Sequence, residues 1–361
     1  MSESWVVAVE IGAALLLPAF LLSLGFCALA RQYAPELGFL DRPGGHKGHQ
    51  IPTPLGGGVA IWLATTLVIA SATLVAVFGK SWLPASVATY IPGMLSRIGE
   101  LGAILGLATV IMVMGLIDDR KSLHWGLRLG IQILCATLVV LSGVRLTLYG
   151  PFTHPALGGF ITVLWIVGLT NSFNMLDNMD GLAASVGMIA AALFCAAQLA
   201  VGSLFPPAVL LVLIGALAGF LVHNHNPARL FMGDAGSNFL GFLLGSMTVV
   251  GAFTGEGHSQ LGVLTPLLVM AVPLYDTVSV ILIRLSEGRS PFLGDRRHFS
   301  HRLVARGLTP KHAVWTIDLV TLACGLGALL LHRLDYWGGL VVLAQTVSLL
   351  GVVAILEFST G

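Results

Sequence analysis

Long apolar runs alternate with short polar connections along most of the chain. About eleven of these runs have roughly the 17–25 residues with which an α-helix crosses the hydrocarbon core of a bilayer. They lie at 5–30, 55–78, 98–117, 127–144, 157–176, 182–202, 206–222, 238–253, 261–283, 312–331 and 337–357. The first run is too long for the apolar part of a cleavable signal peptide, so it predicts a spanning helix. The pattern therefore predicts an all-α polytopic membrane protein that forms one domain over residues 1–361.

The composition supports a lipid environment. Apolar residues make up 56% of the chain and charged residues only 10%, whereas a soluble domain carries roughly 25% charged residues. The four cysteines fall inside apolar runs without the spacing of a metal site, so they predict small buried hydrophobic residues. They are Cys27, Cys135, Cys195 and Cys324.

The basic residues lie mostly on one side of the predicted membrane. The connections after the first, third, fifth, seventh and ninth runs, with the adjoining run ends, hold 14 of the 18 Lys and Arg residues. The other side holds Lys80, Arg97, Arg145 and Arg333. Because cytoplasmic loops are enriched in Lys and Arg, the count places the N-terminus outside and the C-terminus in the cytoplasm.

Acids and histidines gather on the same cytoplasmic side, and this asymmetry predicts an enzyme that works at that surface. A transporter or lipid flippase, the alternative of another class, usually places polar residues near the bilayer midplane. The candidate intramembrane acids are Glu10, Glu100, Asp276 and Asp318, and the sequence names no partner for Asp276.

The stretch GLIDDRKSL places Asp118 and Asp119 side by side at the end of an apolar run. Two adjacent carboxylates repel each other unless a cation lies between them. They can bind a divalent metal or divide into a base and a ligand. A charged helix end balanced by Arg120 and Lys121 is the simpler interpretation.

The stretch NSFNMLDNMDGLA interrupts two apolar runs with five polar side chains. They are Asn171, Asn174, Asp177, Asn178 and Asp180. Helix capping and turn formation explain one or two such residues, and Asp180-Gly181 is a turn signal. Five polar residues favour a binding site.

In RLFMGDAGSNFLGF, Gly233 and Gly236 flank Asp234 and allow close approach of a ligand to the backbone. The N-terminus of the following helix would favour an anion. Asp234 is then either a metal ligand next to a phosphate or a capping carboxylate.

Two further loops carry basic groups. GRSPFLGDRRHFSHRL holds Arg296, His298 and His301, which suit a diphosphate, although a basic loop can equally contact anionic lipid headgroups. DRPGGHKGHQIPTPLGGG holds Lys47 and His49 in a segment too rich in Pro and Gly for a regular helix,.

Taken together, these five motifs occur on one face and resemble the polyprenyl-phosphate N-acetylhexosamine-1-phosphate transferases of the WecA and TagO type. The resemblance covers roughly residues 36–311. It implies a bacterial plasma-membrane enzyme that transfers N-acetylhexosamine-1-phosphate from a UDP-sugar, UDP-GlcNAc above all, to undecaprenyl phosphate. UMP leaves, and the lipid-linked sugar diphosphate feeds cell-envelope glycan synthesis. It further implies Mg²⁺ as cofactor, with Mn²⁺ as an alternative ion, contact with membrane lipid and no nucleic-acid partner; a homodimer is compatible with it.

The resemblance also implies roles for individual residues. Asp118 would act as base for the lipid phosphate, with Asp119 as helper or metal contact, and Asp234 with Asn174 would bind Mg²⁺. Phe231 would stack on uracil. Positions near the nucleotide and sugar would be Asn171, Asp177, Asn178 and Asp180, and positions near the phosphates would be Lys47, His49, Arg296, His298 and His301.

The chain departs from the family pattern at two positions. Asn178 stands where relatives often have Gly, and Ser300 stands where they often have the middle His of an HxHH motif. If position 178 needs a positive φ, Asn tolerates it better than most residues. SPFLGD and the absence of three consecutive histidines favour a simple UDP-N-acetylhexosamine donor over the alternative, a phospho-MurNAc-pentapeptide transferase.

Overall fold

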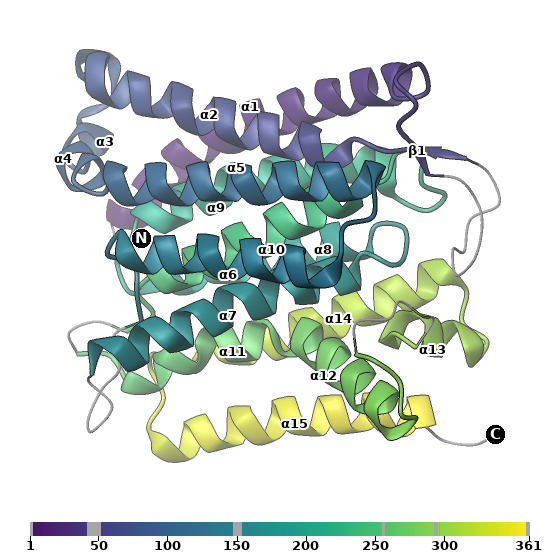
Figure 1. Cartoon of the computed structure of the whole chain (residues 1–361). Helices are drawn as coiled ribbons and strands as arrows, with labels where there is room; N and C mark the ends of the chain where they lie inside the picture. Colours follow the sequence, from purple (N-terminus) through teal and green to yellow (C-terminus); the bar gives the residue numbers. More distant parts are fainter. Residues whose placement is uncertain are drawn as a thin grey trace.

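The computed structural model describes residues 3–41, 52–146, 154–254, 257–291, 295 and 297–358. It is a bundle of long helices that run roughly side by side (Figure 1). The long helices are α1 (Glu3–Tyr33), α2 (Gly57–Phe78), α5 (Ile98–Arg120), α6 (Trp125–Leu141), α7 (Pro155–Leu176), α8 (Leu182–Ala200), α9 (Phe205–Asn224), α10 (Gly233–Val250), α12 (Ala271–Ser286), α14 (Pro310–Ala328) and α15 (Tyr336–Phe358).

Shorter elements lie at the two ends of this bundle. The two-stranded antiparallel pair β1 (Leu40–Asp41) and β2 (Thr53–Pro54) and the helix α13 (Phe299–Ala305) lie at one end (Figure 1). The helices α3 (Ala85–Ala88) and α4 (Ile91–Leu95) lie at the other, next to the 3₁₀ turn η1 (Lys80–Trp82). A second 3₁₀ turn, η3 (Gln260–Leu264), leads into α11 (Thr265–Val269).

Each of the eleven predicted apolar runs coincides with a helix or, for 261–283, with a bent pair of helices. Within the described ranges, seven helices are long and apolar enough to cross a membrane, or eight if the pair bent by 58° at Met270 is one span. These are fewer than the predicted eleven. The helices α6, α10 and α14 fall outside the seven, and α6 has 17 residues.

The helix α10 explains part of this difference. It packs against α2, α5 and α7, and nearly all of its residues from Ala235 to Val250 are buried. A helix surrounded by protein needs no lipid-facing apolar surface, so its first turns can carry Asp234, Ser237 and Asn238. The four cysteines, also predicted to be buried, are free and buried in the structure.

Glycines allow α10 to approach its neighbours at backbone distance. A Cβ atom added at Gly58 on α2 would lie 2.2 Å from the backbone nitrogen of Gly236, and one at Gly115 on α5 would lie 2.3 Å from the carbonyl oxygen of Asp234. The first turn of α2 also donates from Gly57 N to Phe231 O and from Gly58 N to Met232 O, both at 3.0 Å. The glycines of DRPGGHKGHQIPTPLGGG and GLIDDRKSL thus bring these two motifs into contact with the start of α10.

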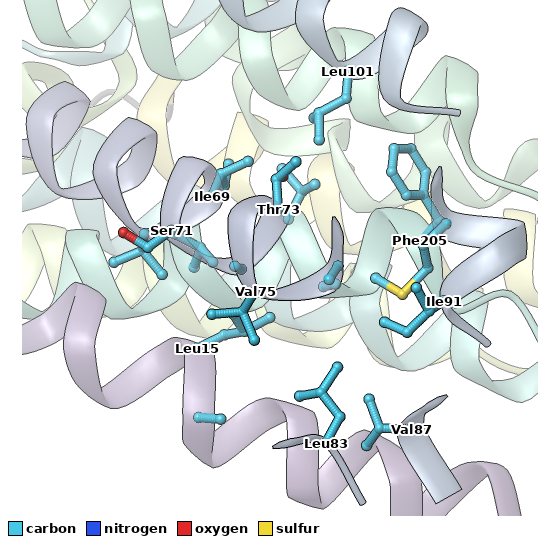
Figure 2. Close-up of a pocket in the computed structure, with 18 of the residues that line it drawn as sticks. Leu15, Ile69, Ser71, Thr73, Val75, Leu83, Val87, Ile91, Leu101 and Phe205 are labelled. Carbon is cyan, nitrogen blue, oxygen red and sulfur yellow. The ribbon is translucent and has the colours of Figure 1, made fainter. Parts of the chain in front are cut away.

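An apolar pocket of about 500 Å³ lies at the end of the bundle that carries α3 and α4. Figure 2 shows Leu15, Val75 and Phe205 among its lining side chains, from α1, α2 and α9. Leu101 on α5 also lines it. Because Leu101 and Asp118 are 17 residues apart on α5, the pocket lies roughly 25 Å from the acidic end of that helix. It is therefore separate from the acidic residues described below.

The close contact between α5 and α10 gives a prediction for two glycines on the same helix. Gly115→Ala should lower thermal stability in detergent, since overpacking a buried contact costs about 1–3 kcal/mol. Gly106→Ala is the matched control, because a Cβ atom at Gly106 meets nothing within 4 Å, and it should leave the unfolding temperature unchanged. Equal unfolding temperatures for the two variants would contradict the packing described here.

Candidate active site

Asp118 and Asp119 lie at the C-terminal end of α5 and turn toward different neighbours. Successive residues on a helix point about 100° apart, which separates the two carboxylates. Asp118 accepts hydrogen bonds from Leu123 N, at 2.6 Å, and from Arg128 Nη1 on α6. Asp119 points to the start of α10 instead. The predicted pair is therefore divided between two helix contacts.

Asp119 caps the N-terminus of α10. Its carboxylate accepts from the backbone N–H groups of Asp234, at 2.7 Å, and Ala235, at 3.2 Å. These N–H groups have no partner within their own helix, and a negative charge at this end is favourable. Gly233 precedes them with φ +70°, and a Cβ atom there would lie 2.6 Å from Asp119 Oδ2. The anion predicted at this helix end is thus Asp119 itself, and the capping carboxylate is Asp119 rather than Asp234.

The side chain of Asp234 is more accessible than that of Asp118. Asn174 Nδ2 on α7 donates to Asp234 Oδ1 at 2.8 Å and also approaches Ser237 Oγ at 3.1 Å. Arg128 Nη1 lies 3.4 Å from Asp234 Oδ2. The side chain of Asp234 is 34% exposed, against 5% for Asp118. Asp234 is therefore the more exposed of these two acids.

Arg128 was missed as a site residue by the sequence analysis, which counted it only as a cation at the end of a run. It lies in the first turn of α6 and bridges Asp118 and Asp234. Its signal in the sequence is an Arg among apolar residues ten positions after Asp118. The bridge joins α5, α6 and α10 at one end of the bundle.

Asn171 lies in a chain of amides inside the bundle. Its Nδ2 donates to Gln132 Oε1 at 2.6 Å, Gln132 Nε2 donates to Asn238 Oδ1 at 3.0 Å, and Asn238 Nδ2 donates to Asp234 O at 2.8 Å. Gln132 and Asn238 are almost fully buried. This network connects α6, α7 and α10, so Asn171 holds these helices together below the site. Its predicted contact with the nucleotide or sugar stays a prediction.

Asp177 and Asp180 follow α7 in the connection to α8. Burial, the largest cause, and the neighbouring carboxylates Asp119 and Asp180 together raise the pKa of Asp177 to about 7. Asp180 accepts from Asn226 Nδ2 at 3.0 Å and from Ala228 N at 2.9 Å, which fixes the loop after α9. Gly181 has φ +80° and forms the predicted turn.

Asn178 does not need the left-handed backbone conformation. Among the described residues, positive φ angles occur only at glycines. Both polar atoms of its side chain are engaged: Nδ2 donates to Met175 O at 2.7 Å, and Oδ1 accepts from Ser300 Oγ on α13.

Phe231 precedes the Gly-Asp turn and is held by its backbone. Its N–H donates to Pro54 O at 2.9 Å, and it pairs in parallel with Leu55. The ring is half-buried. Its predicted stacking on uracil stays a prediction.

The helix α13 carries His298 at its N-cap and His301 in its first turn, with ring centroids 6.5 Å apart. The structure supplies the partner that the sequence did not name for Asp276. Its carboxylate, 1% exposed, contacts His298 Nδ1 at 2.9 Å and accepts from Phe299 N at 2.6 Å. Asp276 therefore fixes the start of α13 and the orientation of the His298 ring.

The described arginines of the basic loop pair with acids. Arg297 and Arg289 contact Glu287, and Arg302 binds the buried Glu357 on α15 at 2.8 Å. These ion pairs stabilise the loop. Lys47, His49 and Arg296, predicted to contact the phosphates, lie outside the described residues.

The charges of the cluster fit a cation. The negative charges of Asp118 and Asp119 lie near Asp234, and those of Asp119 and Asp180 lie near Asp177. Arg128 offsets part of this charge. Among the residues that the structure describes, no three His, Cys, Asp or Glu side chains converge as a preformed metal site. A hard cation would therefore use Asp234 and amide oxygen from Asn174 and complete its shell with ligand and water oxygens.

The Arg128 bridge gives a second prediction. Arg128→Gln should lower thermal stability in detergent by about 1–3 kcal/mol, because it removes charge-assisted hydrogen bonds and leaves two carboxylates facing each other. Arg128→Lys should fall between this variant and the wild type, since it keeps the charge but loses the fork. Arg229→Gln is the control, because the exposed side chain of Arg229 bonds only to the Val222 carbonyl among the contacts described. An Arg128→Gln protein as stable as the control would refute the bridge.

Comparison with known proteins identifies the family. The sequence profile of Glycosyl transferase family 4 matches residues 101–252. The chain is 35% identical over 316 residues to the decaprenyl-phosphate N-acetylglucosaminephosphotransferase of Mycobacterium tuberculosis strain H37Rv, covering 80% of this chain and 74% of that protein.

Two further relatives carry similar names. The chain is 28% identical over 332 residues to the probable undecaprenyl-phosphate N-acetylglucosaminyl 1-phosphate transferase of Bacillus subtilis, covering 90% of this chain and 86% of that protein. It is 29% identical over 338 residues to the undecaprenyl-phosphate α-N-acetylglucosaminyl 1-phosphate transferase of Escherichia coli K12, covering 86% and 80%. Together with the described parts of the five motifs at one end of the bundle, these matches show that the chain belongs to the polyprenyl-phosphate N-acetylhexosamine-1-phosphate transferase family.

Proposed function

We propose that this protein transfers GlcNAc-1-phosphate from UDP-GlcNAc to undecaprenyl phosphate, releasing UMP and forming a lipid-linked sugar diphosphate. The observation that carries the proposal is the cluster of Asp118, Asp119, Asn174 and Asp234 around Arg128. The similar proteins named as GlcNAc-1-phosphate transferases support the donor and the lipid acceptor.

The reaction joins two anionic groups, so the site must reduce their repulsion. The phosphate of the lipid attacks the phosphate that carries the sugar, and the bond to UMP breaks. Positioned cations and hydrogen-bond donors stabilise the charge that builds up in such a transition state. In this proposal, the exposed carboxylate of Asp234 holds the cation, and Arg128, whose Nη1 lies 3.4 Å from Asp234 Oδ2, contacts a phosphate oxygen.

Mg²⁺ is the cofactor that this donor set would take, held by Asp234 and Asn174 with Asp119 as the nearby acid. When bound, it supplies positive charge that polarises phosphate oxygens. Asp119 keeps the first turn of α10 in place through two backbone hydrogen bonds. Asn174 orients the Asp234 carboxylate from the end of α7.

The remaining side chains divide between the two substrates. Asp118, held by Leu123 N and Arg128, receives the last proton of the lipid phosphate or orients this group. Phe231 stacks on uracil, while Asp177 and Asp180 face the nucleoside and sugar. The diphosphate is bound by the basic groups of two loops: Lys47, His49, Arg296, His298 and His301.

The proposal also includes eleven membrane crossings, with the N-terminus outside and the C-terminus in the cytoplasm of a bacterial cell. The helices α6, α10 and α14, which are not among the seven long and apolar enough to cross a membrane, connect elements at opposite ends of the bundle (Figure 1). Asp118 and Asp119 at the end of α5, Asp177 after α7 and Asp234 at the start of α10 lie at one end, and the excess of Lys and Arg in the connections on that side supports a cytoplasmic site,.

The proposed reaction is tested by UMP release. Purified protein with Mg²⁺ and undecaprenyl phosphate should release UMP from UDP-GlcNAc faster than from UDP-GalNAc, UDP-glucose or UDP-MurNAc-pentapeptide. A preference for the pentapeptide donor would assign the protein to the other branch of the family. Absence of UMP release with every UDP-N-acetylhexosamine would overturn the proposed function.

A further inference from the structure

The helix α13 is held in place by polar contacts from three different parts of the chain. Asp276 on α12 binds its N-terminus, and Glu357 on α15 binds Arg302 near its C-terminus. The third contact comes from Ser300, whose hydroxyl donates to Asn178 Oδ1. This third contact joins α13 directly to the segment after α7 that carries Asp177 and Asp180.

The geometry of Asn178 makes it a link between two elements. Its Nδ2 donates to Met175 O in the last turn of α7, while its Oδ1 accepts from Ser300. Ser300 is 1% exposed, so its end of the hydrogen bond is shielded from water. Both polar atoms of the Asn178 amide are therefore used within the protein, and Ser300 has no open surface for a substrate.

The two linked residues are the two departures from the family pattern. A Gly at position 178 has no side chain with which to reach α13, and a His at position 300 is larger than the buried Ser. In this chain the polar amide and the small hydroxyl meet instead. Ser300 is therefore small enough to lie buried beside Asn178, and its hydroxyl is the hydrogen-bond donor that the Asn178 amide oxygen needs.

We infer that Asn178 and Ser300 form a positioning pair, which sets His298 and His301 relative to the acids and amides at the end of α7. This inference rests on the proposed function, in which the two histidines bind the donor diphosphate. Asp276 and Glu357 attach α13 to α12 and α15. The Asn178–Ser300 bond attaches it to the side of the site that carries Asn174 and Asp177. Neither member of the pair touches the substrate.

A double-mutant cycle tests the pair. The variants are Ser300→Ala, Asn178→Ala and the double variant, measured for kcat/KM with UDP-GlcNAc and for the KM of undecaprenyl phosphate. Loss of one shielded hydrogen bond should lower kcat/KM for the donor by about three- to tenfold. Because Ser300 acts through Asn178, the double variant should be no slower than Asn178→Ala. The KM of the lipid should stay unchanged, since the pair positions the groups for the donor.

Two controls separate this role from a general loss of structure. Ser286→Ala removes a hydroxyl that bonds only within its own helix among the contacts described, to Ile283 O, and should keep wild-type kinetics. Ser300→Thr keeps the hydroxyl and should retain more activity than Ser300→Ala. Additive losses in the double variant, or a Ser300→Ala protein with wild-type kcat/KM, would overturn the inference.

Hydrogen–deuterium exchange gives a readout that does not depend on the reaction. The amides of residues 299–305 should exchange faster in Ser300→Ala and Asn178→Ala, and no faster in the double variant than in Asn178→Ala. Unchanged exchange in both single variants would refute the link. If the wild type releases no UMP while exchange shows the coupling, the proposed function fails and the Asn178–Ser300 link stands.

Discussion

The rest of the site depends on one interaction, the capping of α10 by the Asp119 carboxylate. Two backbone N–H groups at the start of α10 point to this carboxylate. Gly233 provides the backbone conformation and the space that the contact requires. Because the cap fixes the first turn of α10, it also fixes Asp234, which can then meet Asn174 and Arg128. Without the cap, buried N–H groups would lack partners, at a cost of about 1–3 kcal/mol each.

Gathering these acids in one cluster lowers the stability of the fold, and the proposed reaction explains why they are gathered. Carboxylates that are gathered at a half-buried site lose solvation and repel each other, and burial first, then this repulsion, raises the pKa of Asp177. A protein selected for stability alone would separate such groups. In the proposed reaction, a cation held between two phosphates would offset this repulsion, which would favour keeping the acids together. The buried amide chain from Asn171 to Asn238 keeps the supporting helices in register without adding charge.

Part of this arrangement could be predicted from the sequence. The apolar runs located the long helices, and the order of the motifs indicated which connections meet. Asp118, Asp119, Asn174 and Asp234 were predicted as a group, and the structure brings their side chains together. This grouping came from the family resemblance of the motifs, and the roles of the four residues stay predictions.

Other features depend on tertiary contacts that no local pattern contains. In the sequence, Arg128 resembles any cation at a helix end. Its contacts with Asp118 and Asp234 become evident only in the structure, where α6 lies beside α5 and α10. The short distance at Gly115 and the bond between Asn178 and Ser300 join residues that are far apart in the chain. Hydropathy predicted α10 as an ordinary span, although the surrounding helices bury it and allow it to carry polar residues.

The most direct test of the account is calorimetric binding of UDP-GlcNAc without lipid acceptor, in the presence and absence of Mg²⁺. The wild type should bind the donor more tightly with Mg²⁺ than without it, and Asp234→Asn should lose this difference. Asp318→Asn is the matched control, because Asp318 on α14 bonds to Ser185, away from the cluster, and it should keep the Mg²⁺ effect. Equal Mg²⁺ dependence in the wild type and Asp234→Asn would contradict the central role of the α10 turn.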